Sequence, residues 1–168
     1  MVAFQKFRTF ASPTAGGGPM LVLTFRVAGS DYAIAVARVA GVVPRVPLRA
    51  LPQAPPHLVG LLRYRGGAVP VVDLGLLMGG AACGEQLDTR IILVDTGAEV
   101  GGLLGLAAER VDEVRTLDRS RGAVAGPEIG AARYLGDVYE TDDGLLQLIE
   151  PGRVLVGLTP AAVGEGPG

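Results

Sequence analysis

The sequence of 168 residues has no tryptophan and only four phenylalanines and four tyrosines. So few aromatic side chains leave little material for the stacking platforms on which nucleic-acid bases bind. The formal net charge of -2 at pH 7 and the pI of about 5.4 also differ from those of typical nucleic-acid-binding domains, which present a basic surface. We therefore expect no nucleic-acid partner.

Histidine and cysteine are scarce, with one residue of each in the chain. His57 and Cys83 do not supply the three or four ligands of a typical zinc site. No Gly-x-Ser-x-Gly nucleophile motif occurs, and the glycines of residues 101–105 lack the Lys-Ser/Thr pair of a phosphate-binding loop. We interpret His57 as a structural residue and Cys83 as a small residue in a glycine-rich loop. The sequence predicts no enzymatic activity, no metal site and no cofactor.

Long apolar runs are missing as well. No stretch of the sequence approaches the roughly 18 to 20 apolar residues that span a bilayer. Lys6 and Arg8 are not followed by the apolar core of a signal peptide. The single cysteine, which cannot form an internal disulfide, is compatible with a reducing compartment. These patterns predict a cytoplasmic protein with no direct membrane insertion.

The length fits one domain flanked by two tails. Residues 1–19 are interpreted as a mobile tail that ends in a Gly-Gly-Gly-Pro break, residues 20–160 as the domain, and residues 161–168 as a C-terminal tail. Phe4, Phe7 and Phe10 recur at helical spacing within the first segment. A short aromatic segment that docks on a partner or on the domain's own sheet is therefore the alternative interpretation of residues 1–19.

Residues 60–74 predict a β-hairpin in which a Gly66-Gly67 turn joins two apolar-rich strands. Because side chains alternate along a strand, Arg63 and Arg65 are expected on one face, and Leu62 and Tyr64 on the other. The returning strand is apolar on both faces up to Asp73, so we expect it to lie between two layers. Pro70 lacks an N–H group, which places it at an edge or a bulge. Arginines at the tip of such a hairpin suit contact with another protein.

Other segments also predict short strands, which favours a β-sandwich or small barrels. The mixed charges of residues 109–115 are interpreted as a solvated, salt-bridged face. Brief helices are expected at Val36 to Val43, after Asp73, and from Pro151. Three further hairpins are expected: Leu21 to Val27 with Tyr32 to Val36 around Gly29-Ser30, Ile91 to Val94 with Val100 to Leu106, and Tyr134 to Glu140 with Leu145 to Ile149 around Asp142 to Gly144.

The hairpin region also resembles a known family. Gly60, Arg65-Gly66 and Val69 to Leu74 are similar to the central motif of the CheW-like domain of bacterial chemotaxis systems. The resemblance covers residues 20 to 158. It continues in order through Leu21 to Phe25, Gly29, Tyr32 to Ile34, Val36, Val39, Val42, Pro52, Pro55, Leu58, Arg90 to Asp95, Gly105-Leu106, Val111, Val114, Tyr134 to Gly136, Leu145 to Glu150 and Arg153 to Leu155.

This resemblance implies an all-β fold of two small five-stranded SH3-like barrels, packed around a shared core with a few short helices and a groove between them. It implies an adaptor that couples the cytoplasmic tips of methyl-accepting chemoreceptors to a CheA-type histidine kinase and performs no chemistry itself. Such a protein would be cytoplasmic and recruited to membrane-bound receptor arrays through its partners. A CheW-like scaffold in another signalling or motility pathway is the alternative.

The resemblance also suggests site residues. Arg65 matches the motif arginine and is expected to contact a partner, with Arg63 adding charge nearby and with Val36, Val39, Val42 and Leu58 as an apolar lining. Gly60, Gly66, Gly67, Pro70 and Asp73 are expected to shape the motif. Two other interpretations stay open. Arg65 could pair internally with Asp73, and the valines could be core residues.

Three positions depart from the family pattern. Arg63 replaces a frequent asparagine, and Ala35 and Gly41 stand where acidic residues are common. These changes add positive charge and remove negative charge, so they could alter which partner is recognised. A shallow groove rather than a deep ligand pocket is expected to carry the site.

Overall fold

The computed structural model describes residues 18–84, 88–97, 102–121, 123–124 and 134–154. Residues 1–17 of the predicted N-terminal tail (residues 1–19), the end of the predicted domain at residues 155–160, and the predicted C-terminal tail at residues 161–168 lie outside this part of the chain. The strands are β1 (Pro19–Val27), β2 (Ser30–Ala35), β3 (Val39–Pro44), β4 (Leu58–Tyr64), β5 (Gly67–Asp73), β6 (Arg90–Asp95), β7 (Leu103–Asp118), β8 (Ala123–Val124), β9 (Leu135–Thr141) and β10 (Gly144–Ile149). The short helices are η2 (Val36–Arg38), α1 (Leu74–Leu77), η3 (Arg119–Arg121) and α2 (Pro151–Val154).

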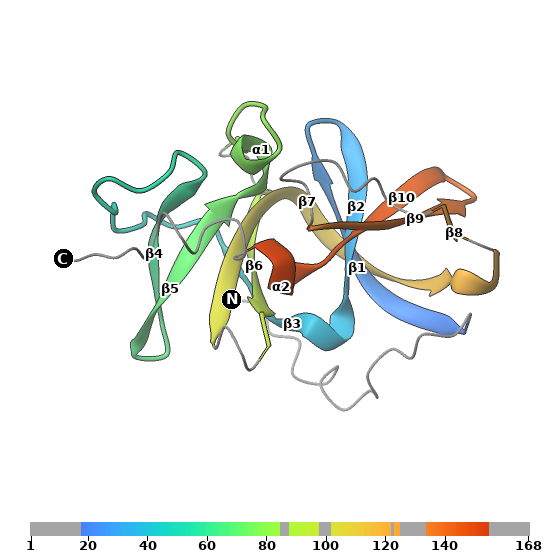
Figure 1. The fold of residues 1–168 in the computed structure, drawn as a ribbon. Helices are drawn as coiled ribbons and strands as arrows, with labels where there is room; N and C mark the ends of the chain where they lie inside the picture. The colour runs from blue at the N-terminus through green and yellow to red at the C-terminus, as the bar shows by residue number, and fades with distance from the viewer. Residues whose placement is uncertain (1–17, 85–87, 98–101, 122, 125–133, 155–168) are drawn as a thin grey trace.

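The strands confirm the all-β class and form two lobes that share β7 (Figure 1). In the first lobe, β3, β6, the first half of β7, β5 and β4 are neighbours in that order. In the second lobe, the second half of β7 is followed by β1, β2, β10, β9 and β8. The path of hydrogen-bonded strands is open, so the sheets curl in the manner of SH3-like barrels without closing.

Strand β7 changes partners at its centre and thereby joins the two lobes. Its residues up to Ala108 pair with β6, and those from Glu109 onward pair with β1. Arg110 has a positive φ of 51°, and the β1 register shifts between Thr24 and Arg26 at the same level. Such irregularities bend a strand and increase its twist. The sequence predicted only the first half of β7, which ends near Leu106, and missed its continuation.

The largest core cluster spans both lobes. Leu23 and Ile34 of the second lobe belong to the same cluster as Val72, Ile92 and Leu106 of the first lobe. All five side chains are at most 2 % exposed. Two smaller clusters of buried residues lie within the second and the first lobe, respectively. The two lobes therefore share one apolar interior.

The predicted helix at Val36 to Val43 is wrong except for its first turn, η2. The remainder forms β3, which pairs with β6 and carries a bulge between Val39 and Gly41. A bulge inserts one residue, so side chains three positions apart point to the same face of a strand. Val39 and Val42 both enter the shared core for this reason. The expected helical turns after Asp73 and from Pro151 are confirmed as α1 and α2.

Two predicted hairpin turns are displaced by one residue. Arg65 and Gly66 form the turn between β4 and β5, with φ values of 50° and 80°, and Tyr64 pairs with Gly67. Ala28 and Gly29 occupy the same positions between β1 and β2. A type I′ turn needs positive φ at both central residues. A residue other than glycine can occupy the first central position when glycine occupies the second. The expected Gly66-Gly67 and Gly29-Ser30 turns are corrected accordingly.

Candidate protein-contact site

Arg65 lies at the exposed tip of the β4–β5 hairpin, at one end of the molecule (Figure 1). Its guanidinium carbon is 5.2 Å from the centroid of the Tyr64 ring. A cation at this distance over a tyrosine face is attracted by about 0.5 to 1 kcal/mol when exposed. The stacked ring restricts the long side chain of Arg65, while the guanidinium keeps its donors for a partner.

Tyr64 packs against residues of two other strands of the first lobe, β3 and β5. It packs against the cluster that contains Leu62 and Val71, and a Cβ added at Gly41 would lie 3.5 Å from its hydroxyl oxygen. Gly41 is therefore small where the Tyr64 ring reaches over β3. An acidic side chain at position 41 would compete for this space. The departure at Gly41 thus has a packing explanation inside this chain. No sequence signal indicates this contact, because the two residues belong to different strands.

Arg63 and Arg65 do not lie on one strand face, in contrast to the prediction. Arg65 belongs to the turn, and its positive φ removes it from the strand alternation. Arg63 stays on β4, where it is exposed and pairs with Ala68 of β5. Arg65 therefore lies at the tip of the hairpin, and Arg63 lies on its exposed face.

The internal pair between Arg65 and Asp73 does not form. Asp73 ends β5 at the opposite end from the tip, a separation of about 20 Å along the strand. Its buried carboxylate caps α1 by accepting a hydrogen bond from the Leu76 N–H at 3.1 Å. It also accepts the Cys83 N–H at 3.0 Å. Asp73 is thus a structural residue that fixes the loop after α1.

The glycines and proline of the motif shape its backbone. Gly60 has a φ of 153°, and a Cβ there would lie 2.7 Å from the Arg49 carbonyl oxygen. Gly66 occupies the second turn position, and Gly67 begins β5. Pro70 pairs with β4, while the pairs between β5 and β7 begin one residue later at Val71. Pro70 therefore lies outside the stretch that is paired on both sides, as its missing N–H group requires.

The apolar residues expected to line the site lie in the interior instead. Val36, Val39 and Val42 are 3 %, 4 % and 4 % exposed, and Leu58 is 9 % exposed. All four belong to the shared core. A partner that leaves the fold intact cannot reach these side chains. The alternative interpretation of the valines, as core residues, is the one that the structure supports.

The thiol of Cys83 is buried and donates to the Ala107 carbonyl oxygen at 3.4 Å. Burial, together with the nearby Asp73 carboxylate, raises the pKa of Cys83 to about 12. The thiolate, which is the reactive form, is therefore scarce at neutral pH. Partial burial lowers the pKa of His57. His57 is consequently uncharged at neutral pH.

Two hollows of the described surface lie in the second lobe, away from Arg65. The larger one, of about 440 Å³, is bordered by three ion pairs. They join Arg26 to Asp31 at 3.1 Å, Arg110 to Asp88 at 3.8 Å, and Arg115 to Asp143 at 3.2 Å. The last two confirm the interpretation of residues 109–115 as a salt-bridged face. This hollow is open and charged, which is unlike an apolar ligand pocket.

The described residues contain neither a candidate membrane span nor a candidate metal site. None of the helices in this part of the chain is long and apolar enough to cross a membrane. The same residues contain no group of three or more His, Cys, Asp or Glu side chains that could hold a metal ion.

The open, two-lobed β structure is of the SH3-like class. Comparison of the sequence with family models assigns the chain to one family of this class. The family model described as "CheW-like domain" matches residues 21–157. The chain belongs to the CheW-like domain family.

Individual relatives agree with this assignment. The chain is 28 % identical over 94 residues to "Chemotaxis protein CheW" of Rhizobium meliloti (strain 1021), which covers 56 % of this chain and 60 % of the relative. It is 23 % identical over 96 residues to "Probable chemotaxis protein CheW" of Rhizobium etli, covering 57 % of this chain and 62 % of the relative. The matches thus span about three fifths of the curated relatives. The crystal structure of the scaffolding protein TtCheW from Thermoanaerobacter tengcongensis superimposes with a TM-score of 0.69 at 27 % identity, covering 78 % of this chain and 88 % of that chain.

Proposed function

We propose that this protein is an adaptor that couples chemoreceptors to a CheA-type histidine kinase in bacterial chemotaxis. The observation that carries the proposal is the match of the CheW-like domain model to residues 21–157. The names of the relatives and of the structural neighbour, a scaffolding protein, point in the same direction. The partners in this proposal are the kinase and the cytoplasmic tips of methyl-accepting receptors.

The architecture suits this role. An adaptor needs at least two separate contact surfaces on one rigid body, each of about 1,000 Å² or more. The two lobes supply separate surfaces, and the shared core and β7 hold them in a fixed relation. In the cell, the protein would stay in the cytoplasm and join receptor arrays at the membrane through its partners. It needs no catalytic group, metal or cofactor for this work.

Arg65 is proposed as the central polar contact, with Arg63 beside it. A guanidinium makes two parallel hydrogen bonds to one carboxylate, a geometry that lysine cannot reproduce. Arg65 is exposed at the tip and restricted by the Tyr64 ring. Such preorganisation lowers the entropic cost of forming the contact.

The test is reconstitution with the kinase and a receptor cytoplasmic fragment encoded in the same genome. We expect the protein to bind both at once and to raise receptor-dependent kinase activity. Arg65→Glu should weaken receptor binding by about 2 kcal/mol or more, with an unchanged circular dichroism spectrum. Arg110→Glu, an equal charge change on the second lobe, is the control. Binding to neither partner would contradict the proposal, and equal binding by the Arg65→Glu variant would remove Arg65 from the site.

A CheW-like scaffold outside chemotaxis is the second candidate. It is favoured by the departures at Ala35 and Arg63, which change the charge that a partner would meet. Deletion of the gene distinguishes the two candidates. Loss of directed swimming in a chemical gradient supports chemotaxis, whereas normal gradient responses with a defect in another kinase pathway support the alternative.

A further inference from the structure

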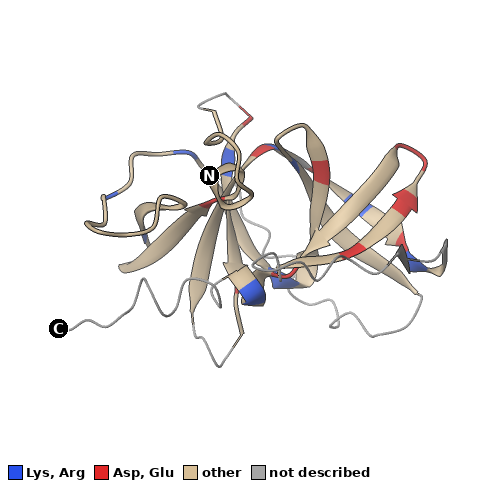
Figure 2. Cartoon of the chain, turned by 45° about the horizontal axis from the view of Figure 1, so that its top comes forward, with Lys and Arg blue, Asp and Glu red and all other residues tan. Residues whose placement is uncertain are grey.

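Three exposed arginines of the first lobe have no ion-pair partner among the described residues. They are Arg49, Arg63 and Arg65. Arg26, Arg110 and Arg115, by contrast, form ion pairs in the second lobe and at the bend of β7. Figure 2 shows basic segments along the loop before β4, while most of the acidic segments lie in the other half of the molecule. Charge is thus distributed unevenly between the two ends.

Arg49 is joined to β4 by the backbone. Its N–H donates to the Leu61 carbonyl oxygen at 2.9 Å, and the Leu61 N–H donates to the Arg49 carbonyl oxygen at 2.8 Å. Residues that exchange both bonds in an antiparallel pair carry their side chains on the same face. Leu61 and Arg63 are two positions apart on β4 and therefore point to the same face. Arg49, Leu61 and Arg63 thus share one face. Arg49 and Arg63 are diagonal neighbours on it, with Cα atoms about 7 to 8 Å apart.

The close approach of Arg49 depends on Gly60. A Cβ at position 60 would lie 2.7 Å from the Arg49 carbonyl oxygen and 2.8 Å from the Leu48 Cβ. Any other residue would push this segment away from β4. Gly60 is therefore a positioning residue for Arg49, although it presents no side chain of its own.

The floor between the arginines is apolar. Leu61 pairs with Pro70, and Arg63 pairs with Ala68. Leu61 and Pro70 are half-buried, and Ala68 is exposed. We call the surface formed by Arg49, Leu61, Arg63, Ala68 and Pro70 the arginine face.

We propose that the arginine face binds an acidic protein segment in which two carboxylates flank an aliphatic side chain. Each guanidinium matches one carboxylate in a bidentate geometry, and the floor of Leu61 and Pro70 receives the aliphatic group. Carboxylates four residues apart on a helix have Cβ atoms about 6 Å apart, which agrees with the diagonal spacing of the arginines. The inference extends the proposed function, because it names the chemistry of one partner. It adds Arg49 to the contact and Gly60 as the residue that positions Arg49.

The first test uses a defined probe. It is a helical peptide with two glutamates four positions apart and a leucine three positions after the first, on the same side of the helix. The comparison peptide has glutamines in place of the glutamates. We expect titration to shift the amide signals of Arg49, Leu61, Arg63 and Ala68 in NMR spectra of the wild-type protein. Binding should weaken at least fivefold for the glutamine peptide and for Arg49→Glu, whereas Arg110→Glu should stay within twofold of the wild type.

Gly60→Ala is the second variant, because it substitutes no arginine and acts only by displacing the Arg49 segment. It should lose peptide affinity as Arg49→Glu does, provided that its thermal transition shows a folded protein at the assay temperature. Equal binding by wild type and Arg49→Glu would overturn the proposal. Shifts confined to the β9–β10 hairpin would also overturn it. An oligonucleotide duplex that binds wild type but not Arg49→Glu would assign the face to nucleic acid instead.

The same variants are then titrated with the kinase and the receptor fragment. If wild type binds neither protein, the proposed function fails, while the peptide result still decides the arginine face. If wild type binds one of them and Arg49→Glu binds it equally well, the inference fails and the proposed function stands.

Discussion

Gly60→Ala offers a test of the close approach in the motif, and Gly66→Ala is its matched control. Both glycines have positive φ, 153° at Gly60 and 80° at Gly66. A Cβ at Gly60 would lie 2.7 Å from a backbone oxygen, whereas a Cβ at Gly66 meets no atom within 4 Å. Both substitutions therefore strain the backbone, and Gly60→Ala alone adds a steric conflict.

The magnitudes follow from these contacts. Alanine at positive φ costs about 1 to 2 kcal/mol at either position. At Gly60 the Arg49 segment must also move, which weakens the two hydrogen bonds between Arg49 and Leu61. Each bond contributes about 1 kcal/mol. We expect the free energy of unfolding to fall by about 3 kcal/mol for Gly60→Ala and by about 1 kcal/mol for Gly66→Ala.

Equilibrium unfolding in urea, followed by circular dichroism, measures both values. The slope of the transition should stay unchanged, because both variants unfold from the same fold to similar chains. If Gly60→Ala costs no more than Gly66→Ala, the segment at Arg49 is not held against β4. The reasoning on Gly60 and on the arginine face would then both be refuted.

Other predictions follow from buried or stacked groups. Asp73→Ala should cost about 2 to 4 kcal/mol of unfolding free energy in urea, because the Leu76 and Cys83 N–H groups lose their acceptor; a cost below about 0.5 kcal/mol would contradict the cap. The pKa of Cys83 is raised to about 12 from 9.0. Between these two pH values the thiol is protonated in the native state and ionised in the unfolded chain. Stability from this group should fall between pH 9 and pH 12, and a disulfide reagent should modify Cys83 on the order of a thousandfold more slowly in the native protein; equal rates in native and unfolded protein would refute the burial. Tyr64→Leu should weaken the partner contact of Arg65 by about 0.5 to 1 kcal/mol in calorimetric titration, whereas Tyr64→Phe should retain it; similar losses in both variants would exclude the stacking.

The hairpins were predictable because their information is local. Asp142 to Gly144 marks the turn between β9 and β10, and the run Val69 to Val72 marks a strand that is buried in large part on both faces. The turn residues themselves were displaced by one position where a non-glycine residue accepts positive φ, as Arg65 does. Sequence identifies the presence of a glycine turn more readily than its register, because either neighbour of the glycine can complete it.

Features that depend on distant pairing were not predictable. Val36, Val39 and Val42 are spaced as in a helix, yet only Val36 lies in a helical turn, and a bulge against β6 gives Val39 and Val42 the same spacing within a strand. The second half of β7 carries the mixed charges of a surface segment, but its pairing with β1 makes it the connection between lobes. In each case, the deciding contact is with a strand more than 40 positions away in the sequence.

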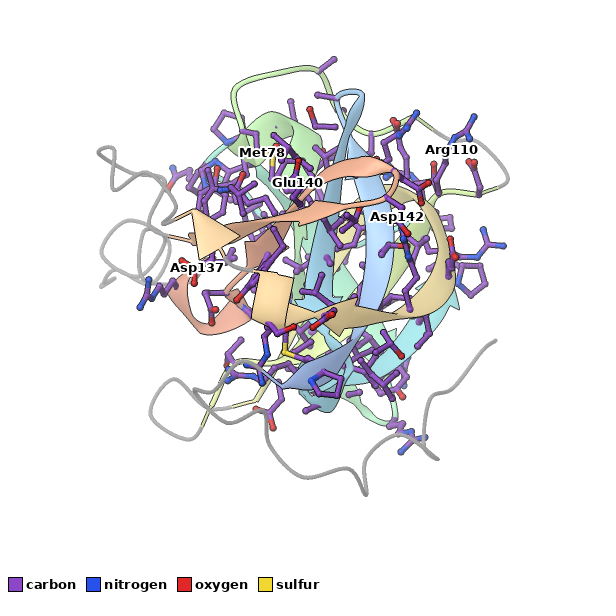
Figure 3. The ribbon with its side chains drawn as sticks, turned by 90° about the vertical axis from the view of Figure 1, so that its right-hand side faces the viewer. Met78, Arg110, Asp137, Glu140 and Asp142 are labelled. Carbon is purple, nitrogen blue, oxygen red and sulfur yellow. The ribbon has the colours of Figure 1, made fainter. Side chains whose placement is uncertain are left out.

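The acidic residues of the second lobe do not neutralise the arginines of the first lobe. Asp137, Glu140 and Asp142 lie on β9 and the turn that follows it, and Figure 3 shows them in the second lobe. Arg63 and Arg65 lie on the opposite lobe (Figure 1). Charges separated by more than about 8 Å are screened at physiological salt, so the acidic end does not reduce the attraction of the arginines for an outside carboxylate.

The motif glycines therefore determine where the arginines are presented. Gly60 brings the Arg49 backbone against β4, and Gly66 completes the turn that presents Arg65. Neither glycine has a side chain that a partner could recognise, yet each sets the position of a guanidinium. A substitution at Gly60 would thus impair binding by moving Arg49, with no contact to the partner removed. For this reason, the backbone conformation of the hairpin belongs to the binding surface as much as its charges do.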